Sequence, residues 1–372
     1  MYRLALVAKR VGVCVAAAAT TMAVVSAPTA QAQPVDPVTV VLSGLNNPYD
    51  VQFGTLGLMF VAENGGAQIT AAIPALGFSL PIVGNLSGIA SATSPFGQLL
   101  FVTGSPEPDP MGPPPPPPPA GSPDPASLYA ANLFGPPHKI ADLTAYELAH
   151  NPDGQLQFDP VTHAPLDALS NPFRVLKRGF FDDAYIADGG ANDVLTVDFF
   201  GNVRTLFVPP TVNTGTCAGL ANNSLATVGC DSVPTGLAFG PDGKLYVSAF
   251  TSGKRGEGRV YVLDPRNGAL QRTITGLDGP TGVTVGDDGS VYVTEVTYSA
   301  SQSSGPPAQG PPPGRIVKIA PGGTQSAAAV PLPLGITFHD GALYSTAFSL
   351  AGPGAGKVVR VAPSAFTPLT AP

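Results

Sequence analysis

Residues 234–250 read PTGLAFGPDGKLYVSAF, and residues 280–296 read PTGVTVGDDGSVYVTEV. The two segments align residue for residue without a gap and begin about fifty residues apart, which is typical of a repeat architecture. In each copy, two short apolar runs flank a tight turn, GPDG in the first and GDDG in the second. This pattern predicts a β-hairpin whose strands are buried on both faces.

Two further strands are predicted after each hairpin. They are RVYVLD (259–264) and ALQRTI (269–274) in one copy, and RIVKIA (315–320) and TQSAAAV (324–330) in the other. Four antiparallel strands per repeat make a propeller blade. Weaker copies begin near Asn47, Gly88, Asn171 and Pro333. The sequence therefore predicts an all-β, six-bladed β-propeller over residues 33–372.

The ends of the predicted propeller complement each other. VTVVLSG (38–44) is a strand with no partners ahead of it, and the last repeat, which ends at KVVRVAP (357–363), lacks a fourth strand. Pairing the N-terminal strand onto the last blade removes an exposed edge. An open stack of sheets is the alternative.

The N-terminus has the pattern of a secretory signal peptide over residues 1–32. Arg3, Lys9 and Arg10 precede an apolar run and the small-residue motif that ends at Ala32, the expected cleavage site. An uncleaved membrane anchor is the alternative, although the apolar run is short for a bilayer span. We expect a secreted protein, either extracellular or in the cell envelope.

The charge balance argues against a nucleic-acid partner. The chain carries 18 basic and 25 acidic residues, and loss of the three basic residues in the signal peptide would take the formal charge from -7 to -10. No basic stripe is present to release counterions from a phosphate backbone. We expect a monomer without a stable membrane span.

Two cysteines remain after the signal peptide, Cys217 and Cys230, and a polar stretch separates them. In an exported chain this arrangement predicts a disulfide that closes a short loop. A metal site built on two thiols is disfavoured because no histidine lies near them in the sequence.

Long connections are predicted to gather at one end of the propeller. The loops from second to third strand and from one blade to the next emerge at the same end, which we call the loop-bearing face. The long connections there are 105–125, 141–170, 211–231 and 298–313, of which the first and last are proline-rich. Unequal loops on a rigid scaffold indicate a binding face for a small ligand or a cell-envelope partner. Tolerated low-complexity loops are the alternative for the proline-rich segments.

Three carboxylates occupy equivalent positions at the ends of second strands: Glu63, Asp188 and Glu295. Converging on the central channel, with Asp50, Asn192 and Asp193 nearby in sequence, they would hold a hard cation such as Ca²⁺. Separate, solvated carboxylates are the alternative.

His150 is a candidate general base in the 141–170 connection, where DLTAYELAH has helical spacing. An uninvolved surface histidine is the alternative. The sequence contains no Gly-x-Ser-x-Gly elbow, phosphate-binding loop or His-Glu-x-x-His motif. The catalytic residue therefore stays unknown, and no organic cofactor site is predicted.

Several segments together resemble the ScyD/ScyE family of secreted propellers. They are GLNNP (44–48), DLTAYELAHNPDG (142–154), SNPF (170–173), ADGGANDVL (187–195) and SVPTGLAFGPDGKLYV (232–247). The resemblance covers about residues 38–363 and implies an exported six-bladed propeller of unsettled activity. The proline run at 113–119 departs from the family pattern.

Gluconolactonase-like hydrolases share this architecture, and they hold a divalent metal with Asn or Asp in the middle of a Pro-x-Gly motif. The corresponding positions here are Tyr49, Phe173, Thr235, Thr281 and Leu334. The sequence thus favours a binding or scaffold protein that uses the loop-bearing face. A metal-dependent hydrolase of small lactones or esters, with a rearranged site at Glu63, Asp188 and Glu295, is the second hypothesis.

Overall fold

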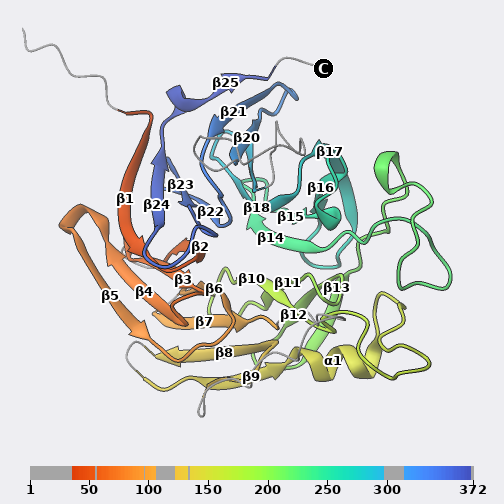
Figure 1. The fold of residues 1–372 in the computed structure, drawn as a ribbon. Coiled ribbons are helices and arrows are strands. Elements are labelled where there is room, and N and C mark those ends of the chain that lie inside the picture. Colours follow the sequence, from red (N-terminus) through yellow and green to blue (C-terminus); the bar gives the residue numbers. More distant parts are fainter. Residues whose placement is uncertain are drawn as a thin grey trace, which may run out of the picture. The chain divides into compact units, whose positions relative to one another are not determined.

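The structure is a computed structural model that describes residues 36–54, 57–95, 97–105, 122–132, 135–296 and 314–369. Within these ranges the strands form six antiparallel sheets in a propeller arrangement (Figure 1), which confirms the predicted fold. The predicted signal peptide with its cleavage site at Ala32 lies outside the described residues. So do the proline-rich runs at 106–121 and 298–313.

The first three blades each contain four strands in sequence order. Blade 1 has β2 (Pro48–Phe53), β3 (Met59–Glu63), β4 (Gln68–Ile73) and β5 (Phe78–Val83). Blade 2 has β6 (Ile89–Thr93), β7 (Gln98–Thr103), β8 (Ser127–Asn132) and β9 (His138–Asp142). Blade 3 has β10 (Pro172–Leu176), β11 (Ala184–Asp188), β12 (Asp193–Val197) and β13 (Val203–Phe207).

The remaining blades include both ends of the described chain. Blade 4 has β14 (Pro234–Phe239), β15 (Leu245–Ala249), β16 (Gly258–Leu263) and β17 (Leu270–Leu277). Blade 5 has β18 (Pro280–Val285), β19 (Val291–Glu295), β20 (Arg315–Ile319) and β21 (Gln325–Ala329), extended by β25 (Thr367–Pro368). Blade 6 has β22 (Ile336–His339), β23 (Ala342–Ala347), β24 (Gly356–Val361) and β1 (Val38–Leu45).

The first described strand closes the last blade. β1 pairs antiparallel with β24, from Val38 opposite Val361 to Leu45 opposite Gly356. Figure 1 shows the two strands side by side although they come from opposite ends of the sequence. The predicted closure is confirmed, and the chain from β1 into β2 links blade 6 to blade 1.

The core lies between neighbouring blades. Second strands such as β3, β15 and β19 are buried along their whole length, because the sheets cover both of their faces. One apolar cluster joins Phe60 and Ile69 of blade 1 to Leu99 and Phe101 of blade 2. This explains the continuous apolar runs in the repeats, which lack the alternation of a sheet with one solvated face.

The repeated Pro-x-Gly motif has a packing reason. A Cβ atom on Gly236 would lie 2.8 Å from Gly282 Cα, and one on Gly335 would lie 2.6 Å from Asp50 Cα. Only glycine allows the backbones of adjacent first strands to approach this closely around the propeller axis. The residue before each glycine is thereby placed at the mouth of the central channel.

Among the described residues, no helix has both the length and the apolar character needed to cross a lipid bilayer.

Candidate functional site

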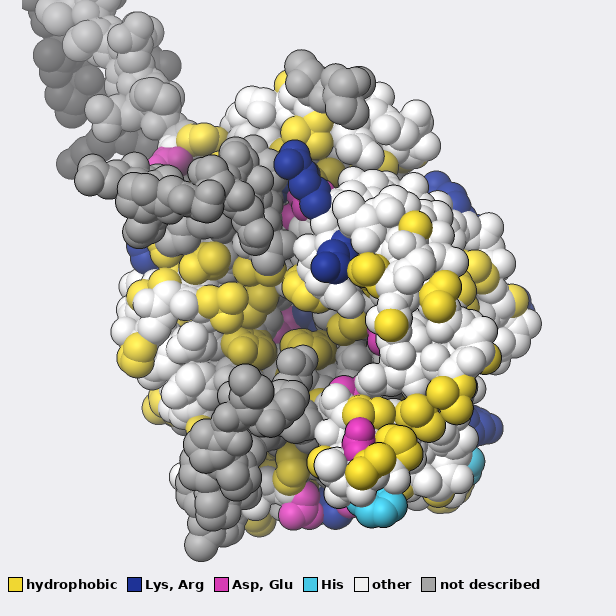
Figure 2. All heavy atoms as spheres, turned by 45° about the vertical axis from the view of Figure 1, so that its right-hand side comes forward, with side chains coloured by type: hydrophobic (Ala, Val, Ile, Leu, Met, Phe, Trp, Pro, Cys, Tyr) yellow, Lys and Arg dark blue, Asp and Glu magenta, His cyan; other side chains and the backbone are white. Residues whose placement is uncertain are grey.

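A pocket of about 250 Å³ opens at the centre of the loop-bearing face. Its lining comes from the starts of first strands and from residues just after second strands, which all lie at that end of the blades. These residues are Tyr49, Asn171, Phe173, Arg174, Gly189, Val233, Thr235, Phe250, Thr281, Val296, Leu334, Gly335 and Leu350. Figure 2 shows a hollow near the middle of the described surface with hydrophobic side chains around it.

The pocket wall includes all five middle residues of the Pro-x-Gly-like motifs. Tyr49, Phe173 and Leu334 contribute apolar surface, whereas Thr235 and Thr281 contribute hydroxyl groups. The hydroxyl of Thr235 donates to Pro280 O at 3.0 Å, and that of Thr281 donates to Pro333 O at 3.2 Å. Each hydroxyl keeps acceptor capacity for a ligand.

The floor of the pocket is a buried ion pair. Arg174 on β10 donates through Nη1 to Asp50 Oδ1 on β2, and its Nη2 donates to Ile336 O at 3.2 Å. Ser91 on β6 donates to the other Asp50 oxygen at 2.5 Å. With the Gln52 amide turned so that its oxygen faces the guanidinium, this oxygen accepts from Arg174 Nε at 2.9 Å. Strands of four blades are therefore joined at the axis.

The electrostatics of the pocket follow from this floor. Burial lowers the pKa of Arg174 to about 9, which still leaves the guanidinium protonated at neutral pH. Asp50 balances its charge, and every guanidinium nitrogen already has an acceptor. The described residues of the lining include no carboxylate, so this donor set does not fit the divalent metal of a gluconolactonase-like hydrolase.

Each of the three carboxylates at second-strand ends accepts a backbone hydrogen bond next to the first strand of its own blade. The backbone N–H groups of Asn46, Asn171 and Asp278 donate to Glu63, Asp188 and Glu295 at 2.7, 2.7 and 2.8 Å, and each pair is 17 residues apart. Each carboxylate thus fixes the turn that precedes its first strand.

The three carboxylates are also buried, with exposures of 2, 0 and 0% for Glu63, Asp188 and Glu295, so they are not the solvated groups of the alternative interpretation. Among the described residues, no three His, Cys, Asp or Glu side chains are placed together to hold a metal. Their role as metal ligands stays a prediction.

The predicted helix in the 141–170 connection is present as α1 (Leu143–His150). Asp142 caps it by accepting from Ala145 N at 2.9 Å. His150 is exposed, stacks on Tyr146 with ring centroids 4.2 Å apart, and its Nδ1 lies 2.9 Å from Tyr146 O. The ring is thus held on the helix, and its assignment as a general base stays a prediction.

The predicted disulfide between Cys217 and Cys230 is confirmed, with Cα atoms 5.3 Å apart. It closes part of the connection between β13 and β14, which borders a second cavity of about 690 Å³ on the loop-bearing face. Both cysteines are buried together with Val212.

We expect the Cys217→Ser/Cys230→Ser double variant to lose about 3 kcal/mol of stability, because the cross-link restricts the unfolded chain. Urea unfolding followed by circular dichroism measures the loss. The wild type under reducing conditions serves as the control and should match the double variant. Equal stability of oxidised wild type and variant contradicts the prediction.

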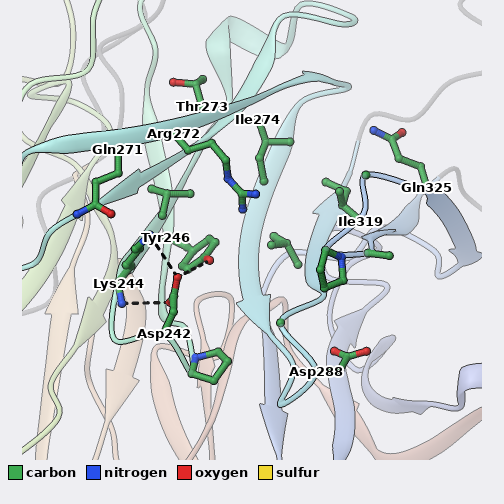
Figure 3. Close-up of a pocket in the computed structure, with 17 residues that line it drawn as sticks. Asp242, Lys244, Tyr246, Gln271, Arg272, Thr273, Ile274, Asp288, Ile319 and Gln325 are labelled. Atoms are coloured by element: carbon green, nitrogen blue, oxygen red, sulfur yellow. Dashed lines mark hydrogen bonds and ion pairs between the residues drawn. The ribbon is translucent and has the colours of Figure 1, made fainter.

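A groove of about 670 Å³ lies on the opposite face, between blades 4 and 5. Figure 3 shows Arg272 extending into it from β17, above Asp242 and Tyr246. Asp242 accepts from the Tyr246 hydroxyl at 3.2 Å and pairs with Lys244 at 3.8 Å. The groove lies between two blades and away from the axis, so it is not the candidate site.

Sequence reasoning missed an aromatic patch on that same opposite face. Phe180, Phe181, Phe199 and Phe200 are 44, 80, 52 and 86% exposed, and neighbouring rings lie 5.0–5.9 Å apart. The two Phe-Phe doublets occupy the β10–β11 and β12–β13 turns, and their presence in polar turns is a signal that the sequence offered. The Arg174–Asp50 pair was also missed, although β2 and β10 each carry one charged residue among largely apolar first-strand positions.

Comparisons with solved structures agree with the fold. A luciferin-regenerating enzyme is 10% identical with a TM-score of 0.54, over 90% of this chain and 97% of that one. A gluconolactonase from Xanthomonas campestris is 10% identical with a TM-score of 0.51, over 87% and 88%. Regucalcin from Agrobacterium tumefaciens, a calcium-binding protein, is 12% identical with a TM-score of 0.50, over 87% and 92%.

No family model matches the sequence, and no curated protein matches it. At 10–12% identity, the likeness to these solved structures shows the fold alone and does not bear on the activity of this chain.

Proposed function

We propose that this protein is an exported propeller that binds a small, uncharged and largely apolar molecule in its central pocket. The observation that supports this most directly is the chemistry of the pocket. Its wall is aromatic, aliphatic and hydroxyl-bearing, and its one cation is neutralised by Asp50. Pockets of this kind select ligands by apolar contact with a few polar groups for orientation.

The volume of about 250 Å³ favours a molecule smaller than a typical drug. Phe173 and Phe250 offer two half-buried rings to such a ligand, and Thr235 and Thr281 offer hydrogen bonds. Export is supported by the signal-peptide pattern at residues 1–32 and by the disulfide.

Membership of the ScyD/ScyE family is part of this proposal. Its support is the sequence resemblance, which is most specific at AYELAHNPDG and ADGGANDVL. In the structure the first segment forms most of α1 and the turn after it, and the second joins β11 to β12.

The test uses 1-naphthol, a neutral aromatic alcohol, titrated into the purified protein and followed by its fluorescence. We expect saturable binding that weakens about tenfold or more in Phe173→Ala, since loss of one buried ring contact is worth more than about 1.4 kcal/mol. Phe199→Ala is the matched control, because it removes the same side chain from the opposite face. Equal affinity in both variants contradicts a central binding site.

The competing function is metal-dependent hydrolysis at Glu63, Asp188 and Glu295. It predicts turnover of gluconolactone by the wild type and loss of that turnover in each of Glu63→Ala, Asp188→Ala and Glu295→Ala. This result would replace the binding function by a hydrolytic one. Binding of 1-naphthol without turnover supports the proposal.

A further inference from the structure

The connection between β9 and β10 and the start of β12 together hold a group of buried oxygen atoms without hydrogen-bond partners. The connection begins with α1, which is tied to β13 by the Tyr146 hydroxyl, 2.9 Å from Thr205 Oγ1. Leu143 packs into the apolar cluster of blades 2 and 3. This anchoring leaves Glu147 only 4% exposed on a helix that runs along the surface.

Among the described residues, most buried side-chain nitrogen and oxygen atoms without a partner belong to this region. They are Glu147 Oε2, both carboxylate oxygens of Asp193, and the amide oxygens of Asn151, Asn192 and Gln155. All of them are acceptors. Asp193 is fully buried, and Glu147, Asn192 and Gln155 are 4, 6 and 9% exposed. In native structures the large majority of buried polar atoms have a partner, so six unpartnered acceptors in one region need an explanation.

The orientations of the three amides are fixed by their nitrogens. Asn151 Nδ2 donates to Gln155 O at 2.9 Å, Asn192 Nδ2 to Asp153 Oδ2 at 3.2 Å, and Gln155 Nε2 to Asp231 Oδ1 at 2.6 Å. Turning any amide over would place its oxygen against an acceptor. The unpartnered oxygens are therefore a consequence of the network and not of an arbitrary amide orientation.

The charges in this region have the same sign. The negative charges of Asp188, Glu147 and Asp153 all act on Asp193. The nearby donors are already used, since Asp188 accepts from Ser170 Oγ and from three backbone N–H groups. A buried carboxylate without donor or counter-ion is strongly unfavourable.

A bound hard cation would coordinate the unpartnered oxygen atoms and would balance the negative charges around them. Ca²⁺ takes six to eight oxygen ligands, and the carboxylate and amide oxygens present here are among the ligands that it prefers. The set contains no thiolate or imidazole, so Zn²⁺ and the softer metals are disfavoured. Mg²⁺ requires near-ideal octahedral geometry and retains several waters, which fits dry protein oxygens less well.

We propose that Glu147 and Asp193, with amide oxygens drawn from Asn151, Asn192 and Gln155, form a Ca²⁺ site that ties the α1 connection to blade 3. The site is separate from the central pocket and does not depend on the proposed ligand. It also differs from the arrangement predicted at the second-strand ends, because two of those carboxylates, Glu63 and Glu295, belong to other blades.

The test compares chelator-stripped protein with and without CaCl₂, by thermal unfolding and by isothermal titration calorimetry. We expect one Ca²⁺ per chain, an unfolding midpoint that rises with CaCl₂ until the site is saturated, and a smaller effect of MgCl₂. In Asp193→Asn the affinity should fall about 100-fold, since the ligand charge is reduced. Without Ca²⁺ this variant should be at least as stable as the wild type, because it lacks the unpaired buried charge.

Asp182→Asn is the matched control, since it removes an equal charge from an exposed position in the same blade and should bind Ca²⁺ like the wild type. Glu147→Gln provides a second test should Asp193→Asn fail to fold. No binding by the wild type, or wild-type affinity in Asp193→Asn or Glu147→Gln, overturns the proposal. Loss of binding in Glu295→Gln, with binding retained in Glu147→Gln, places the metal at the second-strand ends and also overturns it.

Discussion

Replacing Asp50 by alanine is expected to cost about 3–5 kcal/mol of stability, because it leaves Arg174 charged and buried without a counter-ion. Arg174 is 5% exposed and Asp50 is 2% exposed. The change also removes the acceptor of the Ser91 hydroxyl, which itself accepts from Val175 N at 3.1 Å. The inner strands of blades 1, 2 and 3 would lose their common connection. Urea unfolding gives the free-energy difference.

A surface ion pair supplies the control for this variant. Arg204 and Asp183 are joined at 3.0 Å, with side chains 64 and 31% exposed. Asp183→Ala should change stability by no more than about 0.5 kcal/mol, since solvent screens the pair. The double variant Asp50→Leu/Arg174→Met should recover much of the loss, because it removes both charges. Equal effects of Asp50→Ala and Asp183→Ala would show that the axial pair is not important for stability.

Deletion of residues 38–45 should be more damaging than the loss of the axial ion pair. It removes β1, and with it the outer partner of β24 and the fully packed Leu45. The buried leucine contributes about 2 kcal/mol, and each lost ladder hydrogen bond about 0.5–1.5 kcal/mol. We expect a loss on the order of 5 kcal/mol or more and aggregation through the exposed β24 edge.

Removal of the short C-terminal strand is the matched control for this deletion. β25 pairs with β21 through only two residue pairs and lies outside the ring closure. A chain that ends at Phe366 should therefore stay monomeric and cooperatively folded, as judged by gel filtration and thermal unfolding. Similar behaviour of the two truncations would contradict a special role for β1.

The fold could be predicted because each repeat contains the local sequence signals for its own strands and turns. The Pro-x-Gly motif, the Gly-containing turn and the apolar runs act within about fifty residues, so strand positions follow from local pattern and packing periodicity. The disulfide could also be predicted, since the two cysteines outside the predicted signal peptide allow one pairing. The closure by residues 38–44 followed from counting strands in the first and last repeats.

The roles of individual polar residues could not be predicted from local sequence patterns. Glu63, Asp188 and Glu295 share a position in the repeat, and the sequence suggested that they converge. In the structure each one accepts a hydrogen bond from a backbone N–H group 17 residues earlier. Their role as metal ligands stays a prediction.

The architecture thus follows from local patterns in the chain: six blades, their strands, the closing strand and the face that carries the long connections. Which charges meet depends instead on the folded arrangement. Asp50 and Arg174 are 124 residues apart, and they pair because ring closure brings first strands of different blades together at the axis. Glu147 acts electrostatically on Asp193 because α1 packs against blade 3. Burial makes these contacts decisive for stability, since a charged group removed from water needs a counter-ion or hydrogen-bond partners in the folded protein.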